Sequence, residues 1–200
     1  MDAVRVSALR ERLAGTGWLE AVGGFAGSLR RSVQRRGAGT LLLVGTEAYE
    51  PWHLAAHLAD EAAWSAVPRL APTLLRHRPP AGAPAHLAYD LRRLTEAGRG
   101  ATVLVVAPEA AGAPLLERVH DARRHGATVL ALDGAPTAAG DLGGLAHERL
   151  AVGTAAEEPF DLAQHLVSAA AGRPAGRRSA LDRLADLAGR LTSAPGLSRW

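Results

Sequence analysis

Residues 102–132 read TVLVVAPEAAGAPLLERVHDARRHGATVLAL, and this stretch decides the fold. The continuous apolar run at 102–106 predicts a strand that is buried on both faces. The pattern at 114–124 predicts a helix that stops near Gly126, and residues 128–132 form a second apolar run. About 26 residues separate equivalent positions of the two runs. This spacing is typical of a right-handed parallel β-α-β crossover.

Further units of the same kind lie on both sides of this stretch. Residues 40–44 (TLLLV) predict another buried strand, and residues 51–64 predict a helix with a proline in its first turn. Residues 149–152 predict a strand, and residues 160–171 predict a helix. Alternating strands and helices favour an α/β fold with a doubly wound parallel sheet of about four to five strands, flanked by helices.

Weaker patterns occupy the remaining segments. Residues 4–36 follow a helical period, which we expect to break or kink at the glycines of 15–17 and 23–24. Residues 67–70 predict a weak strand, and its proline restricts it to a sheet edge or a loop. Residues 90–97 predict a short helix.

We expect one domain over residues 1–172, because a chain of 200 residues with 48% hydrophobic content can bury one sizeable core. Residues 173–200 predict a linker and then an amphipathic helix, which would pack on the domain or on a dimer partner. The apolar stripe of this helix consists of Leu181, Leu184, Leu187 and Leu191.

The composition excludes several classes of chemistry. The chain has no Cys, which excludes disulfides, thiolate metal sites and thiol nucleophiles, and it has no Lys, which excludes a Walker-type phosphate loop and Schiff-base catalysis. The net charge is only +3. No apolar run approaches the roughly 18 to 20 residues that span a bilayer, and the first ten residues lack the pattern of a signal peptide. We therefore expect a cytoplasmic protein.

The runs and loops described above resemble the sugar-isomerase (SIS) domain family over about residues 20–170. The likeness is carried by RHGATVLAL at 124–132 and LGGLAHERL at 142–150, together with the strand, turn and helix at 40–61. The resemblance implies a three-layer SIS-like sandwich that binds a phosphorylated sugar or another carbohydrate derivative. It also implies a homodimer, since family members commonly dimerise.

The segment 107–114 reads APEAAGAP and departs from the family pattern. In the SIS family this loop is rich in Ser and Thr, whose hydroxyls surround a phosphate together with N–H groups at a helix start. Here the segment has no hydroxyl, two prolines without N–H groups, and the carboxylate of Glu109, which would repel an anion. Glu109 and Gly112 are ligand-binding candidates by position. Glu109 would favour a neutral or cationic ligand, or it would only cap the following helix.

The loop after the first strand provides the other ligand-binding candidates, because ligands of doubly wound sheets bind at the carboxyl ends of the strands. These candidates are Gly45, Thr46, Glu47 and Tyr49. Thr46 can donate a hydrogen bond to a ligand, Glu47 can act as an acid or base, and Tyr49 can stack. The alternative is structural: Gly45 makes the turn, Thr46 or Glu47 approaches the helix cap, and Tyr49 closes the end of the sheet.

Three residues are candidates for catalysis. Glu47 is one, and His147 and Glu148 are added by the resemblance, because SIS isomerases recruit His and Glu for proton transfer. The resemblance in these two residues is by residue type only. Any enzymatic activity would be an aldose–ketose isomerisation of a sugar phosphate.

Two other polar clusters suggest metal or nucleic acid. His53 and His57 have a spacing that can chelate a metal, but no HExxH motif is present and no third ligand is evident. We predict no metal and no cofactor. The cluster Arg30, Arg31, Arg35 and Arg36 lacks interleaved aromatic residues, so we interpret it as a solvated helix end rather than as a nucleic-acid platform.

Three functional hypotheses remain from the sequence. The first is an SIS-like protein that binds a sugar phosphate or a related carbohydrate derivative, with or without catalysis. The second is a non-catalytic regulatory or dimeric interaction module that has lost this binding. The third is an Arg-rich protein that binds nucleic acid.

Overall fold

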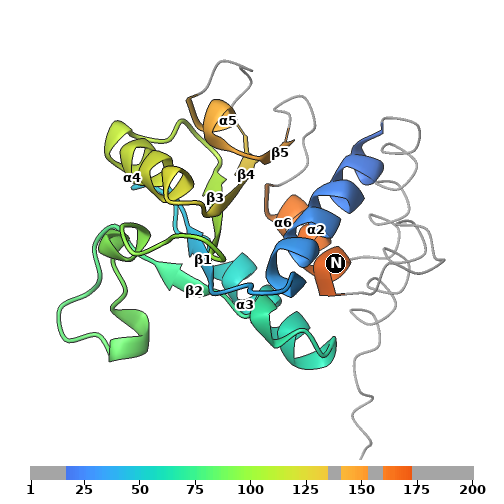
Figure 1. Cartoon of the computed structure of the whole chain (residues 1–200), viewed down its shortest axis with the longest axis horizontal. Helices are drawn as coiled ribbons and strands as arrows, with labels where there is room; N and C mark the ends of the chain where they lie inside the picture. The colour runs from blue at the N-terminus through green and yellow to red at the C-terminus, as the bar shows by residue number, and fades with distance from the viewer. Residues whose placement is uncertain (1–16, 135–140, 153–159, 173–200) are drawn as a thin grey trace, which may run out of the picture.

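The sheet of the computed structural model consists of parallel strands in the order β2-β1-β3-β4-β5, within the described residues 17–134, 141–152 and 160–172 (Figure 1). The strands are β1 (Leu41–Val44), β2 (Thr73–Leu75), β3 (Thr102–Ala107), β4 (Thr128–Asp133) and β5 (Glu148–Ala151). The helices are α2 (Trp18–Gln34), α3 (Trp52–Trp64), α4 (Ala113–Arg124), α5 (Asp141–Leu145) and α6 (Phe160–Gly172). This arrangement confirms the predicted α/β sheet.

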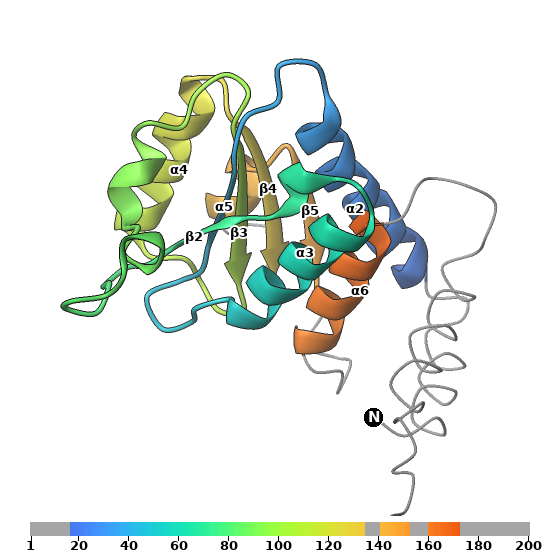
Figure 2. The ribbon, with the colours of Figure 1, turned by 90° about the horizontal axis from the view of Figure 1, so that it is seen from below.

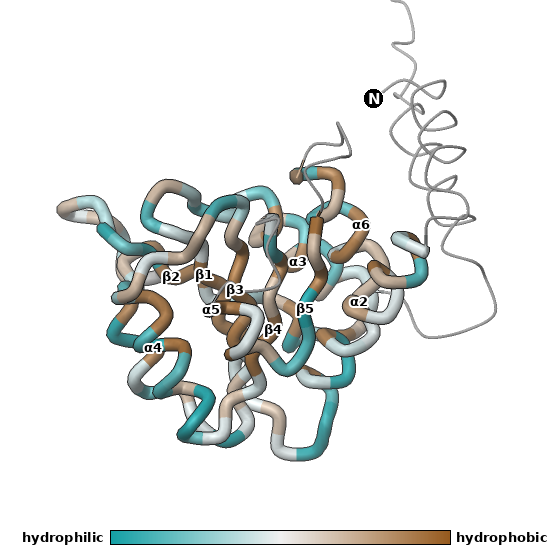
Figure 3. The backbone as a smooth tube through the Cα atoms, turned by 90° about the horizontal axis from the view of Figure 1, so that it is seen from above, coloured by the Kyte–Doolittle hydropathy of each residue, from teal (hydrophilic) through white to brown (hydrophobic). Residues whose placement is uncertain are grey.

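The strands are apolar throughout because both faces of the sheet are covered. All six residues of β3 and all four of β1 are buried. Leu41 and Leu43 pack in the layer formed with α2, α3 and α6, whereas Leu42 and Val44 pack in the layer formed with α4 and α5. Figure 2 shows the sheet between these two groups of helices. In Figure 3, hydrophobic residues follow the strands and hydrophilic ones gather on the outer loops.

The path of the chain creates a divergence between β1 and β3. These strands are neighbours in the sheet, with Leu41 paired to Thr102 and Val44 paired to Val105. After β1 the chain continues to α3 on one face, and after β3 it continues to α4 on the other face. The carboxyl ends of β1 and β3 therefore flank the topological switch point, the place where doubly wound sheets bind ligands.

The edge strand β2 differs from the prediction. The strand expected at residues 67–70 is wrong: Pro68–Leu70 forms a 3-10 helix, η1, and the strand follows at Thr73–Leu75. Pro68 lacks the N–H that a sheet ladder requires, but its fixed φ suits the first position of a helical turn. β2 pairs with β1 in parallel and places the residues that follow Leu75 beside the loop that follows Val44.

Two predicted helices also differ in detail. Residues 90–97 form only a 3-10 helix, η3 (Leu91–Leu94), in which the Asp90 carboxylate accepts a hydrogen bond from the Arg92 backbone N–H at 2.8 Å. A second 3-10 helix, η2 (Ala85–Leu87), precedes it. The break expected at 23–24 is wrong, because α2 is continuous through both glycines. Gly17, with φ of 71°, precedes its first residue.

Several predicted features lie outside the described residues. They are the first part of the helical pattern at 4–36, the amphipathic helix within 173–200, and most of the loop that follows β4. Among the described helices, none combines the length and the apolar character that crossing a membrane requires.

Leu104, in the centre of β3, provides a test of the core. Its side chain is fully buried against the helical layer of α2, α3 and α6. We expect Leu104→Ala to lower the free energy of unfolding by about 2 to 5 kcal/mol, because it removes buried methyl groups and leaves a cavity. Urea denaturation followed by circular dichroism measures this loss. Leu116→Ala, at a half-buried position of α4, is the control, and an equal loss in both variants would contradict the assignment.

Candidate functional site

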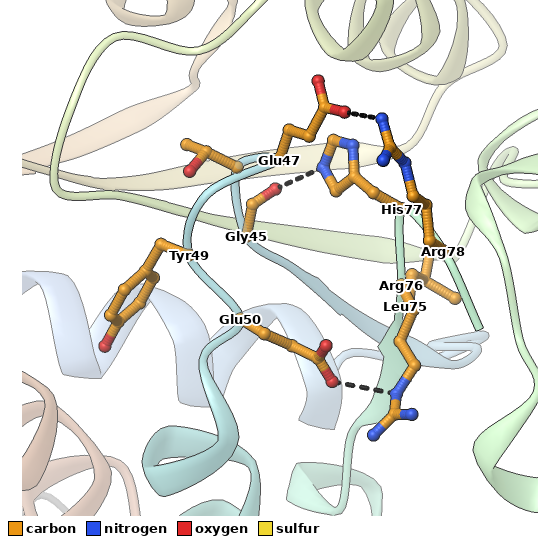
Figure 4. A pocket seen from close by; sticks show the side chains of 9 residues that line it. Gly45, Glu47, Tyr49, Glu50, Leu75, Arg76, His77 and Arg78 are labelled. Carbon is orange, nitrogen blue, oxygen red and sulfur yellow. Dashed lines mark hydrogen bonds and ion pairs between the residues drawn. The ribbon is translucent and has the colours of Figure 1, made fainter. Parts of the chain in front are cut away.

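A cavity of about 190 Å³ opens where the loop after β1 meets the residues after β2. Both segments leave the carboxyl edge of the sheet, because β1 and β2 are parallel neighbours. Figure 4 shows the cavity from close by, with side chains from the two segments directed toward one another. The residues that line it are Gly45, Thr46, Glu47, Tyr49, Glu50, Leu75, Arg76, His77 and Arg78.

Gly45 allows the loop after β1 to fold back on itself. A Cβ atom at this position would overlap with the backbone oxygen of Tyr49 and would lie 2.7 Å from Cδ of Pro51. Only a residue without a side chain permits this approach. The structural role that we considered for Gly45 therefore applies, and its backbone also forms part of the cavity wall.

Three polar contacts join the two segments across the cavity (Figure 4). His77 Nε2 donates to the carbonyl oxygen of Gly45 at 3.1 Å, which requires the hydrogen on Nε2 and leaves Nδ1 as the acceptor of the neutral ring. Arg78 Nη2 donates to Glu47 Oε1. Arg76 Nε lies 2.8 Å from Glu50 Oε1. Two acidic and two basic side chains thus balance one another around the cavity.

The two arginines differ greatly in how firmly they are held. The side chain of Arg76 is only 9% exposed, and its guanidinium lies 4.3 Å from the ring centroid of Trp52 as well as against Glu50. Its backbone N–H donates to the Tyr89 carbonyl at 2.9 Å. By contrast, the side chain of Arg78 is 85% exposed and that of its partner Glu47 is 67% exposed. Arg76 is a fixed wall, whereas Arg78 is a surface cation.

Thr46 is directed away from this group of charges. Its hydroxyl donates to Glu109 Oε1 on the loop after β3, and Thr46 itself is only 5% exposed. This bond crosses the switch point between β1 and β3. Glu109 therefore contacts a predicted ligand-binding residue without lining the cavity among β1 and β2. Gly112 is the N-cap residue of α4 and is exposed, and it also lies outside the cavity lining.

Tyr49 anchors the loop to α6. Its ring projects to the opposite side of the loop from Arg76, His77 and Arg78 in Figure 4. The hydroxyl accepts a hydrogen bond from the buried Gln164 at 2.7 Å and donates to Asp161 Oδ1 at 3.4 Å. Burial, and then the nearby Asp161 carboxylate, raise the pKa of Tyr49 above its ordinary value, so the phenol stays neutral at physiological pH.

His147 and Glu148 lie at the amino end of β5, whereas the cavity lies at the carboxyl edge of the sheet. His147 Nδ1 accepts a hydrogen bond from the Val129 backbone N–H at 3.0 Å, and its own N–H donates to the Val129 carbonyl at 2.8 Å. Glu148 accepts a hydrogen bond from Ser28 of α2. These contacts extend the sheet and tie it to α2, and a catalytic role for the two residues stays a prediction.

The sequence analysis did not identify four lining residues. Glu50 was not among the candidates, and Arg76, His77 and Arg78 were hidden because β2 was misplaced. The signal that could have found them is the segment PTLLRHR at 72–78, a short apolar run followed at once by three basic side chains. Charged groups that directly follow a strand are brought to the ligand-binding edge of a parallel sheet.

The histidine pair predicted on one face of α3 contacts α6. The rings of His57 and His165 have centroids 4.1 Å apart. Burial, and then the neighbouring His57 and His53, lower the pKa of His165 below 6.5. Within the described part of the chain, no group of three or more His, Asp or Glu side chains is arranged to hold a metal ion. Arg30 of α2 donates to the Ala171 carbonyl of α6 at 2.9 Å.

This geometry and topology define a class, the SIS-like α/β proteins, and comparisons with known proteins agree. No family model and no curated protein matches the chain. Among solved structures it is similar to a Salmonella typhimurium LT2 protein provisionally assigned as sugar binding, with a TM-score of 0.53 and 18% identity. That match covers 93% of this chain and 51% of the other.

A second solved structure is a Silicibacter pomeroyi DSS-3 protein provisionally assigned as a phosphosugar isomerase. Its TM-score is 0.50 and its identity 15%, over 91% of this chain and 50% of the other. The chain thus spans about half the length of these two structures. At these identities the likeness shows the fold, and it confirms the SIS-like fold that the sequence resemblance predicted.

Gly45 gives the first test of the site. We expect Gly45→Ala to lower the free energy of unfolding by roughly 1 to 3 kcal/mol, because the added methyl group overlaps with the loop backbone. The control is Gly24→Ala in α2, where a Cβ meets no neighbouring atom; this change should stabilise by roughly 0.5 to 1 kcal/mol. Chemical denaturation of both variants measures the two opposite signs. A harmless Gly45→Ala would show that the loop does not need the close approach.

The His57–His165 contact predicts an acid sensitivity of the α3–α6 packing. Because the pKa of His165 is lowered in the folded state, the unfolded chain binds a proton more readily below pH 6.5. Stability should therefore fall as the pH drops through and below this value. Thermal unfolding between pH 8 and pH 5 measures the effect, and His165→Gln should reduce the slope. The nearby Asp161 carboxylate opposes the shift, and a slope unchanged in the variant would refute the assignment to His165.

Proposed function

We propose that the chain binds a sugar phosphate or a related small carbohydrate derivative in the cavity between the ends of β1 and β2. The observation that carries this proposal is the cavity lining, in which Glu47, Glu50, Arg76 and Arg78 alternate acceptors and donors around a small volume. Carboxylates accept hydrogen bonds from sugar hydroxyls, and guanidinium groups donate to ring oxygens, hydroxyls and anions. The SIS-like fold supports the same class of ligand by analogy.

The size of the cavity favours a small ligand. About 190 Å³ is less than the roughly 300 to 1,000 Å³ of pockets that enclose drug-sized molecules. A single sugar ring with one substituent is therefore the proposed occupant. The balanced charges of the lining also favour a ligand with many hydroxyl groups over a purely anionic or cationic one.

The proposal assigns binding and leaves catalysis open. Aldose–ketose isomerisation requires a base within hydrogen-bond reach of the proton that it removes. Glu47 and Glu50 line the cavity and could meet this requirement, whereas His147 and Glu148 lie at the other end of a strand. We therefore favour Glu47 among the predicted catalytic candidates, should the protein be an enzyme.

We further propose that the protein works as a homodimer in the cytoplasm. The chain spans about half of each solved structure that it resembles, so two copies together would equal the length of one such protein. The amphipathic segment within 173–200 is available to join two copies.

A second candidate function is a non-catalytic interaction module. The observation that favours it is the bond between Thr46 and Glu109, which spans the switch point where a ligand of this fold would bind. If this bond persists in solution, the usual ligand position is filled by the chain itself. The cavity between β1 and β2 would then be a structural gap.

A thermal-shift titration with glucose 6-phosphate, fructose 6-phosphate and ribose 5-phosphate separates the two functions. A ligand present at 100 times its dissociation constant stabilises by about 2.7 kcal/mol, which corresponds to a rise in Tm of roughly 5 to 10 °C for a chain of this size. We expect His77→Ala to abolish the shift, because His77 forms the wall between the two ion pairs. His125→Ala, at an exposed position after α4, is the control. No shift with any compound would favour the interaction module.

A further inference from the structure

We propose that Arg78 is the anion-binding residue of the site, and that it takes the phosphate of the ligand in exchange for the carboxylate of Glu47. This inference rests on the proposed sugar-phosphate function and assigns the phosphate end of the ligand to the β2 side of the cavity. It moves the anion away from the loop between β3 and α4, where the family resemblance predicts it.

The loop between β3 and α4 is poorly suited to an anion. Pro108 has no N–H to donate, and Glu109 places a carboxylate directly on the hydroxyl of Thr46. The hydroxyl that a phosphate would need is therefore already donated to an acidic group. A phosphate at this point would face negative charge and would gain few donors.

The other side of the same loop offers a cation. Among the described residues that line the cavity, Arg76 and Arg78 are the arginines. Arg76 is buried between Glu50 and the ring of Trp52, so its guanidinium is committed to the wall. Arg78 is 85% exposed, and the partner printed for it by the geometry, Glu47, is a flexible surface carboxylate.

Exchange of partners at Arg78 costs little. An ion pair between two exposed side chains contributes only about 0 to 1 kcal/mol. A phosphate monoester carries more negative charge than a carboxylate and can form two parallel bonds with the guanidinium. Phosphate therefore competes well against Glu47. The released Glu47 carboxylate lines the same cavity and can then accept a hydrogen bond from a sugar hydroxyl.

This exchange makes opposite predictions for the two partners of one ion pair. Arg78→Gln removes the cation, so binding of glucose 6-phosphate should weaken roughly tenfold or more. Glu47→Gln removes the competing charge but keeps an acceptor oxygen, so binding of glucose 6-phosphate should tighten by roughly twofold to fivefold. Titration calorimetry at low ionic strength measures both constants, since salt weakens exposed ion pairs.

The matched controls are Arg93→Gln and Glu96→Gln. These residues form an exposed ion pair at 2.9 Å on η3 and do not line the cavity. Neither control should change the affinity. Because Arg78 and Glu47 are both exposed, the variants should keep the Tm of the wild type in the absence of ligand, and this is measured alongside. Unphosphorylated glucose is the second probe, and its affinity should not respond to Arg78→Gln.

The outcomes separate the exchange from the proposed function. If the wild type binds none of the sugar phosphates, both proposals are overturned. If it binds glucose 6-phosphate and Arg78→Gln leaves the affinity unchanged, the exchange is wrong and the sugar-phosphate function stands. If Glu47→Gln weakens binding as much as Arg78→Gln, Glu47 positions Arg78 rather than competes for it, and the exchange is overturned as well.

Discussion

The close approach of the chain at Gly45 is the constraint on which the candidate site depends. The loop after β1 turns back so tightly that the Tyr49 backbone occupies the space of a Cβ atom. This turn brings Glu47 and Glu50 to the side of the loop that faces β2, because both residues follow within one short segment. It also sends Thr46 to the opposite side, toward Glu109. One steric requirement thus distributes the polar groups of the loop between two neighbouring strands.

The parts of the fold that the sequence predicted are those in which burial acts on both faces. The runs at 40–44, 102–106 and 128–132 could only be strands of a covered sheet, because continuous apolar residues of that length leave no solvated face. Edge strand β2 was missed, since three residues between prolines carry almost no periodic signal. Its position is fixed by pairing with β1, which is a long-range contact that local sequence does not reveal.

The candidate site was predictable to the same extent. The rule that ligands bind at the carboxyl ends of parallel strands identified Gly45, Thr46, Glu47 and Tyr49, and all four line the cavity. The rule could not assign their directions, because these depend on the turn at Gly45. Arg76 and its neighbours follow the strand that was misplaced, so no pattern argument could bring them to Glu50.

The bond between Thr46 and Glu109 explains why the chemistry of this chain lies beside the switch point rather than in it. A serine- or threonine-rich loop leaves donors free at the junction of β1 and β3, and an anion can complete them. In this chain a carboxylate on the β3 side accepts the hydroxyl from the β1 side, so the junction satisfies itself. Charges that remain available are then those of β1 and β2, where each carboxylate already faces an arginine. A ligand must compete with such a partner, and the exposed pair yields before the buried one because water already screens it.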